Sequence, residues 1–200
     1  MYNLKTIISI SLISILLSGC AAMGVHSTND PDQKINDAYM LFDEQQRPLP
    51  AERLIREAIT IYKANNNMLG LAEAYRAYGF FFRSGVIGGK YHKHYKERGF
   101  MEKNATYTNR YEKSIEYFKK SAEIYKQNSA LDKLTNIYLN MGFTYEFAGL
   151  PNKACKEYKR SIVVSQTFAR QNPNIKLILP KGYDTHKEYM KPFLDRLICK

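Results

Sequence analysis

The chain has 200 residues, of which 30 are Lys or Arg and 19 are Asp or Glu, for a formal net charge of +11. This length leaves room for one domain with a sizeable core rather than for several domains. Apolar residues recur at intervals of three and four, and no run alternates apolar with polar residues, which excludes a sheet and predicts an all-α chain. The basic excess would make nucleic acid the leading partner of a cytosolic protein. Which partner the charge implies therefore depends on the compartment.

The N-terminus has the organisation of an export signal. One basic residue, Lys5, precedes an uncharged run from Thr6 to Leu17, which is too short to cross a ~30 Å hydrocarbon core but suits the apolar region of a signal peptide. The run ends in Leu17-Ser18-Gly19-Cys20, which closely resembles the bacterial lipobox. We therefore predict a signal peptide over residues 1–19, lipid attachment to Cys20 and a small, polar tether over residues 20–31. The alternative is a short apolar helix that ends in an incidental cysteine.

The lipobox resemblance also implies a location. Asp directly after the lipidated cysteine tends to retain such lipoproteins at the inner membrane, whereas this chain has Ala21. The resemblance therefore implies the periplasmic face of the outer membrane, where two or three acyl chains give a stable anchor. Removal of residues 1–19 leaves 29 basic and 19 acidic side chains, a charge of +10. Because the periplasm holds almost no nucleic acid, we expect none as a partner, and instead expect a protein with an acidic surface or anionic lipid head groups.

Helix signals divide residues 32–171 into three predicted helix pairs, at about 32–65, 67–128 and 131–171. In the last pair, seven positions follow one another at spacings of 4, 3, 4, 5, 4 and 3; they are Tyr138, Gly142, Tyr145, Gly149, Ala154, Tyr158 and Ser161. Here the chain resembles the tetratricopeptide repeat (TPR), in which small residues let two antiparallel helices approach and aromatic residues fill the space beside them. The resemblance implies a short solenoid, and three repeats are the number expected for a stable stack.

An earlier copy of the pattern precedes this one by a constant 63 positions, matching for example Tyr75 with Tyr138 and Gly79 with Gly142. It resembles the TPR subtype of roughly forty residues, which leaves 23 residues unaccounted for. We assign them to an insertion at about residues 84–109, inside the middle repeat.

The insertion carries a basic and aromatic segment, GVIGGKYHKHYKERGF, at residues 85–100. Its glycines allow the chain to leave the helix, so that the segment is free to face a partner. The partner-binding residues predicted here are Lys90, Tyr91, His92, His94, Tyr95, Lys96 and Arg98. The alternative is a solvated excursion with Tyr91 or Tyr95 packed down.

The TPR resemblance further implies a concave surface, lined by the first helix of each pair and suited to a peptide or to another protein's helix. The groove-facing positions carry over to Glu73, Arg76, Phe80 and Arg83 in the middle pair, and to Asn136, Leu139, Phe143, Glu146 and Phe147 in the last. The alternative is that the three phenylalanines belong partly to the core.

The tail after Pro173 changes character, with an extended apolar patch from Ile175 to Leu179 followed by a helical segment. We expect residues 172–200 to cap the exposed apolar end of the stack. The capping side chains are predicted to be Tyr189, Phe193, Leu194 and Leu197.

Two cysteines remain in the mature chain, Cys155 and Cys199. An oxidising compartment permits a disulfide between them, and the alternative is two unpaired thiols in apolar surroundings. The distance and orientation of the two cysteines decide between these alternatives, and the sequence does not give either quantity.

No motif for nucleophilic catalysis, phosphate binding or metal binding is present, and the two histidines of His92-x-His94 alone make a weak metal site. We therefore expect no catalytic residue, no metal and no cofactor. Small size, one anchor, strong charge and an unusual insertion fit an immunity lipoprotein that binds and inhibits a toxic secreted effector, for example a type VI phospholipase. The alternatives are a TPR adaptor or pilotin in the assembly of an envelope complex, and an enzyme acting on peptidoglycan or lipid.

Overall fold

The structure is a computed structural model that describes residues 25 and 27–199. The predicted signal peptide and the predicted lipid-attachment residue Cys20 lie outside these residues. The part of the chain that is described consists of helices without strands, which confirms the all-α prediction. None of its helices combines the length and the apolar run that a membrane crossing requires.

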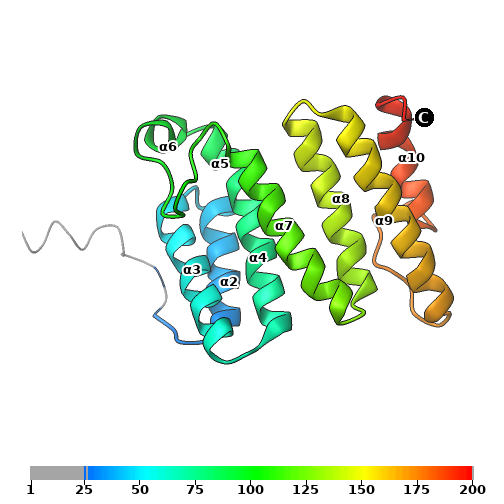
Figure 1. The fold of residues 1–200 in the computed structure, drawn as a ribbon, viewed down its shortest axis with the longest axis horizontal. Coiled ribbons are helices and arrows are strands. Elements are labelled where there is room, and N and C mark those ends of the chain that lie inside the picture. The colour runs from blue at the N-terminus through cyan, green and yellow to red at the C-terminus, as the bar shows by residue number, and fades with distance from the viewer. Residues whose placement is uncertain (1–24, 26, 200) are drawn as a thin grey trace, which may run out of the picture.

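The long helices lie side by side along the long axis of the molecule (Figure 1). In chain order the elements are α2 (Pro31–Tyr39), the π-helical turn η1 (Met40–Glu44), α3 (Pro48–Ala64), α4 (Met68–Arg83), α5 (Gly85–Gly88), α6 (His92–Arg98), α7 (Arg110–Gln127), α8 (Leu131–Phe147), α9 (Pro151–Gln171) and α10 (His186–Arg196). Helices α3 and α9 begin at Pro48 and Pro151, where the amide that proline lacks would have no helical partner in any case. The main core runs through α2, α3, α4, α7 and α8.

Glycine allows close packing in two of the helix pairs. A Cβ atom added at Gly79 in α4 would lie 2.7 Å from the ring of Phe118 in α7, and one added at Gly142 in α8 would lie 2.2 Å from the ring of Tyr158 in α9. The contacting residues are 39 positions apart in the first pair and 16 in the second, a difference of 23. The two pairs therefore share a glycine-to-ring contact. The chain between the contacting residues of α4 and α7 is 23 residues longer than that between those of α8 and α9.

The longer connection, residues 84–109, is folded onto the core. It contains α5 and α6, and its apolar side chains Val86 and Ile87 are 2% and 0% exposed. Glu52 of α3, itself buried, accepts a hydrogen bond from the amide of Met101 at 2.8 Å, and Arg56 pairs with Glu102 at 2.9 Å. The second half of the insertion is therefore fixed to α3, and its first residues follow directly from the end of α4.

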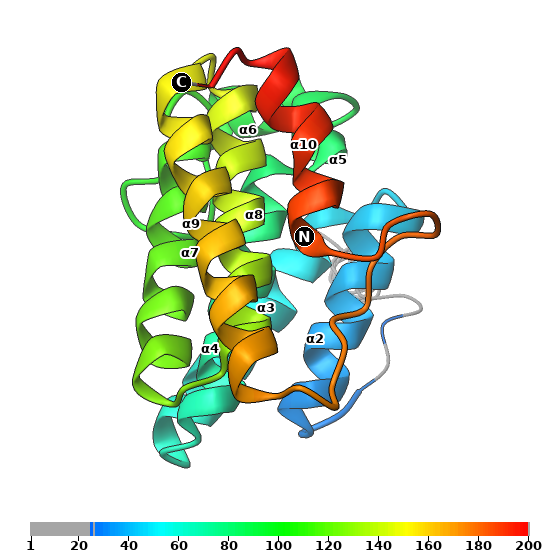
Figure 2. The same cartoon turned by 90° about the vertical axis from the view of Figure 1, so that its right-hand side faces the viewer.

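The C-terminal segment folds back over α8 and α9. Side chains of α10 and of Leu197 directly after it pack in a second cluster with Leu139, Ala154 and Tyr158. They include Met190 and the four residues expected to cap the stack, Tyr189, Phe193, Leu194 and Leu197. A disulfide joins Cys155 in α9 to Cys199. Figure 2 shows α10 and the extended segment before it passing beside α8 and α9. The tail is thus held at both of its ends.

Candidate functional site

Arg83, at the end of α4, lies at the junction between α4 and α8. Its Nη2 donates to Oδ1 of Asn140 at 2.5 Å, and its Nη1 donates to the carbonyl oxygen of Asn140 at 3.2 Å and to the hydroxyl of Thr144 at 3.4 Å. These acceptors are neutral, so they orient the guanidinium without balancing its charge.

Aromatic rings surround the same guanidinium. Its central carbon lies 4.8 Å from the ring centre of Phe80, 5.5 Å from that of Phe118 and 5.7 Å from that of Phe147. Ring faces attract a cation at these distances, and they also exclude water from it. The predicted groove residues Phe80, Arg83 and Phe147 are therefore brought together, with Phe118 of α7 added from the core.

The charge of Arg83 has no close counter-ion within the described chain, where no carboxylate lies within 4.0 Å of it. Asp43 lines the same cavity but lies beyond that distance. Burial lowers the pKa of Arg83 to about 10, which still leaves the side chain charged at neutral pH. A desolvated charge without a counter-ion is costly, so an incoming carboxylate would relieve it.

A cavity of about 400 Å³ opens beside this guanidinium. Its lining comes from η1, α4, α5, α7 and α8 and consists of Phe42, Asp43, Phe80, Arg83, Ser84, Gly85, Gly88, Tyr111 and Phe147. The hydroxyl oxygen of Ser84 is buried and has no hydrogen-bond partner. A carboxylate in this cavity would meet a fixed cation between aromatic walls, an arrangement suited to charge-assisted hydrogen bonds. We call it the Arg83 cavity.

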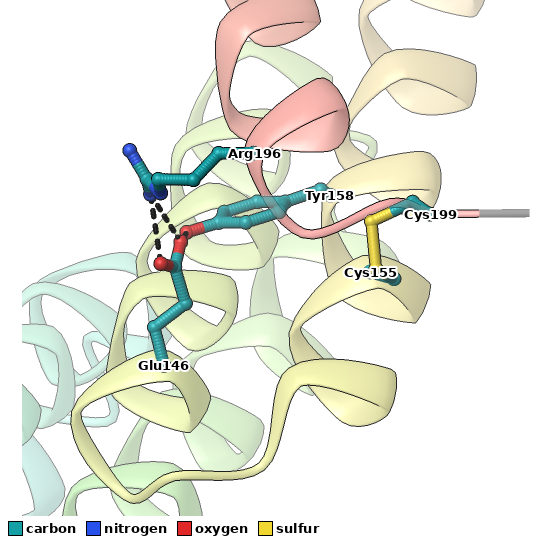
Figure 3. Close-up of a disulfide and its surroundings, with 5 residues drawn as sticks. All are labelled: Glu146, Cys155, Tyr158, Arg196 and Cys199. Atoms are coloured by element: carbon teal, nitrogen blue, oxygen red, sulfur yellow. Dashed lines mark hydrogen bonds and ion pairs between the residues drawn. A yellow bond between two sulfur atoms is a disulfide. The ribbon is translucent and has the colours of Figure 1, made fainter.

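The corresponding end of α8 has its charge balanced internally. Nη2 of Arg196 donates to both carboxylate oxygens of Glu146, at 2.9 and 2.7 Å, and the hydroxyl of Tyr158 donates to the same carboxylate. Figure 3 shows this group next to the Cys155–Cys199 disulfide. The predicted groove residue Glu146 is therefore bound to the chain's own C-terminal helix.

The tail also covers other predicted groove positions on α8. Leu139 is 8% exposed, and the ring of Phe143 lies 5.2 Å from that of Phe193 and 5.6 Å from that of Tyr158. Asn136 remains exposed beside a cavity of about 440 Å³ that also borders residues 175–180. The prediction that Leu139 faces a partner is wrong, because α10 packs over the predicted groove positions on α8.

Arg76 on α4 differs from Arg83 because it has a counter-ion. Its guanidinium contacts the carboxylate of Glu73 at 2.7 Å, and Lys133 of α8 reaches the other oxygen at 3.4 Å. Burial opposes ionisation of Glu73, but the charge of Arg76 and hydrogen bonds lower the pKa of its carboxyl below the ordinary value. The charges predicted at these two groove positions therefore largely satisfy each other.

The insertion separates its predicted binding residues into two sets. Tyr95 is 1% exposed and stacks on Phe100 with ring centres 4.4 Å apart, so its prediction as a contact residue is wrong; α6 turns it toward the core. Tyr91 and His94 are half-buried, and the exposed set is Lys90, His92, Lys96 and Arg98. This exposed set forms the basic outer surface of the insertion.

Two buried titratable groups received no role from the sequence. Burial raises the pKa of Glu52 to about 7, and its carboxylate accepts hydrogen bonds from the hydroxyl of Tyr78 and the amide of Met101. The second group is His186, whose Nε2 lies 2.7 Å from the hydroxyl of Ser161. The pattern Thr185-x-x-Glu188 forms a capping box at the start of α10. This pattern is visible in the sequence and predicts that His186 is the first residue of a helix.

The serine and histidine do not form a nucleophile and base in this arrangement. Ser161 donates its single hydroxyl hydrogen to the carbonyl oxygen of Thr135 at 2.9 Å, so the imidazole must donate to the hydroxyl rather than accept from it. Burial lowers the pKa of His186 to about 4. The pair therefore links α8, α9 and α10 as a buried hydrogen-bonded contact.

Within the described ranges, no group of three or more His, Cys, Asp or Glu side chains is arranged to hold a metal ion. No protein-family model, curated protein or solved structure matches this chain.

Proposed function

We propose that this chain is a lipid-anchored lipoprotein at the periplasmic face of the outer membrane that binds one partner protein. The partner places an acidic side chain in the Arg83 cavity, and another acidic part of its surface contacts the basic outer surface of the insertion. The partner in this proposal is a toxic secreted enzyme, and the chain acts as its immunity protein. The observation that carries the proposal is the half-buried guanidinium of Arg83, which Asn140 and Thr144 hold in place and which has no carboxylate of the described chain within 4.0 Å.

Energetics favour an acidic group in the cavity. A hydrogen bond to a charged group contributes about 1.5–3 kcal/mol, roughly twice the value for neutral groups. Arg83 is oriented before the partner arrives, so little rotamer entropy is lost on binding. The aromatic walls add apolar contact around the carboxylate, in the way that a binding hot spot combines a charge with a dry surround.

The exposed basic set of the insertion supports the same partner chemistry. Lys90, His92, Lys96 and Arg98 are exposed on a segment tied to α3 through Glu52 and Arg56. A fixed positive surface raises the rate of association with an acidic protein and suppresses basic competitors. An inhibitor that must act quickly on one enzyme benefits from both effects.

The repeated packing of α4 on α7 and of α8 on α9 supports a TPR-like arrangement, because the glycine-to-ring contacts recur in both pairs. A disulfide between Cys155 and Cys199 supports an oxidising compartment, where such bonds persist. Both observations agree with an exported scaffold that presents a groove.

The test is capture of the partner by the full-length lipoprotein from membranes, compared between wild type, Arg83→Met and Arg160→Gln. Arg160 is the matched control, because it also stacks on a ring, 4.0 Å from that of Tyr138, but has its own carboxylate partner in Glu157 at 3.0 Å. We expect wild type and Arg160→Gln to retain one stoichiometric enzyme whose toxicity the lipoprotein neutralises, and Arg83→Met to lose it. Recovery of assembly components alone would refute an immunity role, and full retention by Arg83→Met would refute the role of the cavity.

A further inference from the structure

The extended segment between α9 and α10, residues 172–185, exposes apolar side chains; we call it the strap. Ile178 is 100% exposed and Ile175 is 58% exposed, and Tyr183 near its end is 37% exposed. Isolated exposed apolar residues are common on protein surfaces, but here they gather within a few positions of one extended segment.

The strap is fixed in the orientation that exposes these residues. Leu177 and Leu179 are half-buried and border cavities of about 600 and 440 Å³ shared with Phe168. Because side chains alternate along an extended chain, turning both leucines inward turns Ile178 outward. The capping box at Thr185 and the Cys155–Cys199 disulfide secure the helix that follows.

The strap is also basic. Lys176 and Lys181 are both exposed, and the one acidic residue of the strap, Asp184, lies at its end next to α10. Neither lysine forms an ion pair with any described part of the chain. Apolar side chains flanked by unpaired lysines are the combination that binds the interface of an anionic lipid bilayer.

The strap and the start of the described chain lie on one side of the molecule. Figure 2 shows both on the right-hand side of the view, and Figure 1 shows them toward opposite ends of the long axis. A flat surface on that side would therefore meet both. A stretch of eleven residues, the number from Cys20 to Asp30, spans at most about 40 Å, so an anchor at Cys20 keeps this side of the protein close to a bilayer.

We propose that the strap is a second membrane contact, in which Ile178 enters the boundary between head groups and acyl chains, and Lys176 and Lys181 contact the phosphates of anionic phospholipids. This goes beyond the proposed partner binding, since it concerns a surface outside the Arg83 cavity and requires no partner. A second copy of the chain is disfavoured as the occupant because it would bring the same positive charges together.

The test uses the unlipidated mature chain, residues 20–200 with Cys20→Ser, which contains every described residue. Since the chain has no Trp, Ile178→Trp introduces a single fluorescent reporter. Val163→Trp is the control, because Val163 is an exposed apolar residue of α9, 59% exposed, that lies outside the strap. With vesicles of phosphatidylethanolamine and phosphatidylglycerol we expect a blue shift for Ile178→Trp and none for Val163→Trp. With vesicles of phosphatidylcholine alone we expect no shift at either position.

Cosedimentation with the same vesicles gives the size of each contribution. We expect Ile178→Ser to lower the partition coefficient about tenfold, and Lys176→Ser and Lys181→Ser to lower it roughly fivefold each. Val163→Ser should bind as the parent chain does, and matched circular dichroism and melting temperatures establish that each variant is folded. Absence of binding to the anionic vesicles, or equal shifts at positions 163 and 178, would overturn the proposal. So would loss of partner capture by Ile178→Ser with unchanged vesicle binding, because the strap would then be a protein-binding surface. The vesicle assay contains no partner, so its result is separate from the test of the Arg83 cavity.

Discussion

The predicted groove positions on α4 and α8, which we call the two halves of the inner face, correspond at the offset of 63 positions found in the sequence. The two halves differ in how their charged side chains are paired. Arg83 corresponds to Glu146, and Phe80 to Phe143. At Glu146 the chain supplies a counter-ion, Arg196 of α10, at 2.7 Å. At Arg83 the chain supplies only neutral acceptors and rings. One half of the inner face is therefore closed by the tail, and the other retains an unbalanced charge beside a cavity.

This difference explains why equivalent repeat positions receive different roles. The tail satisfies Glu146 and covers Phe143, so the α8 half contributes mainly to stability. On the α4 half the cover comes from α2, where the ring of Tyr39 lies 6.0 Å from that of Phe80. It leaves the half-buried Arg83 without a counter-ion in the described chain, which costs free energy in the isolated protein. We infer that the cost is retained because a partner removes it on binding.

The largest expected effect comes from opening the closed half. Replacing both Cys155 and Cys199 with Ser removes a link between residues 44 positions apart, and the loop-entropy relation gives a loss of up to roughly 4 kcal/mol of unfolding free energy. Chemical denaturation measures the loss, and proteolysis should then cleave in the tail first. Unchanged stability together with a protected tail would show that packing alone holds the cover in place.

The next effect concerns the insertion beside the open half. Glu52 has a folded-state pKa of about 7 against an ordinary value of 4.5, so its contribution to stability is fully present below pH 4.5 and is lost as the pH rises through 7. The loss amounts to about 3 kcal/mol, at ~1.4 kcal/mol for each pKa unit. Unfolding free energies measured from pH 4 to pH 8 should show it in the wild type.

Glu52→Gln is the matched control for this pH dependence, because the amide oxygen still accepts from Tyr78 and Met101 without titrating. Between pH 4 and pH 8 we expect the unfolding free energy of Glu52→Gln to fall by about 3 kcal/mol less than that of the wild type. Identical pH profiles for the two proteins would contradict a buried, titrating Glu52.

A smaller effect compares helix packing in the two halves. Gly142→Ala and Gly79→Ala each place a methyl group against a ring, at 2.2 and 2.7 Å, and overpacking of this kind costs about 1–3 kcal/mol. We expect Gly142→Ala to cost more because its contact is closer. Gly85→Ala is the control, since nothing lies within 4 Å of its added Cβ. A melting temperature for Gly142→Ala equal to that of Gly85→Ala would contradict the close packing.

The smallest effect on stability is the most informative about function. Arg83→Met removes an unbalanced charge while keeping an apolar stem, so we expect stability to stay the same or to rise by up to about 1 kcal/mol. Arg196→Met removes a half-exposed counter-ion from Glu146 and should cost about 0.5–1 kcal/mol. Thermal unfolding of the two variants side by side measures the difference. A large loss for Arg83→Met would mean that Arg83 is a structural residue.

Local patterns in the sequence were enough to find the long helices. The middle pair was expected to end at about residue 128, with its second helix after the insertion at about 84–109, and α7 spans Arg110–Gln127. The prediction succeeds because the periodicity and end signals of this helix lie within the segment itself. The glycines at 85, 88 and 89 indicated a departure from helix, and α5 and α6 form there because Val86, Ile87 and Tyr95 are buried against the core.

The division of the inner face could not be predicted in the same way. The partner of Glu146 is Arg196, 50 positions away, and nothing near Glu146 indicates that the tail returns to it. The offset of 63 made the two inner faces look equivalent, so Leu139 and Phe143 were expected to be as accessible as Phe80. Arg83 lacks a counter-ion because no carboxylate of the described chain folds to within 4.0 Å of it. Only the folded structure shows this.

The central claim is that the counter-ion of Arg83 comes from another protein. The most direct measurement is a structure of this protein bound to the protein that it captures from membranes. We predict a carboxylate oxygen of that protein in the Arg83 cavity, within hydrogen-bond distance of Nη1 or Nη2. A complex in which the cavity is empty, or is filled by an apolar or basic side chain, would contradict the claim.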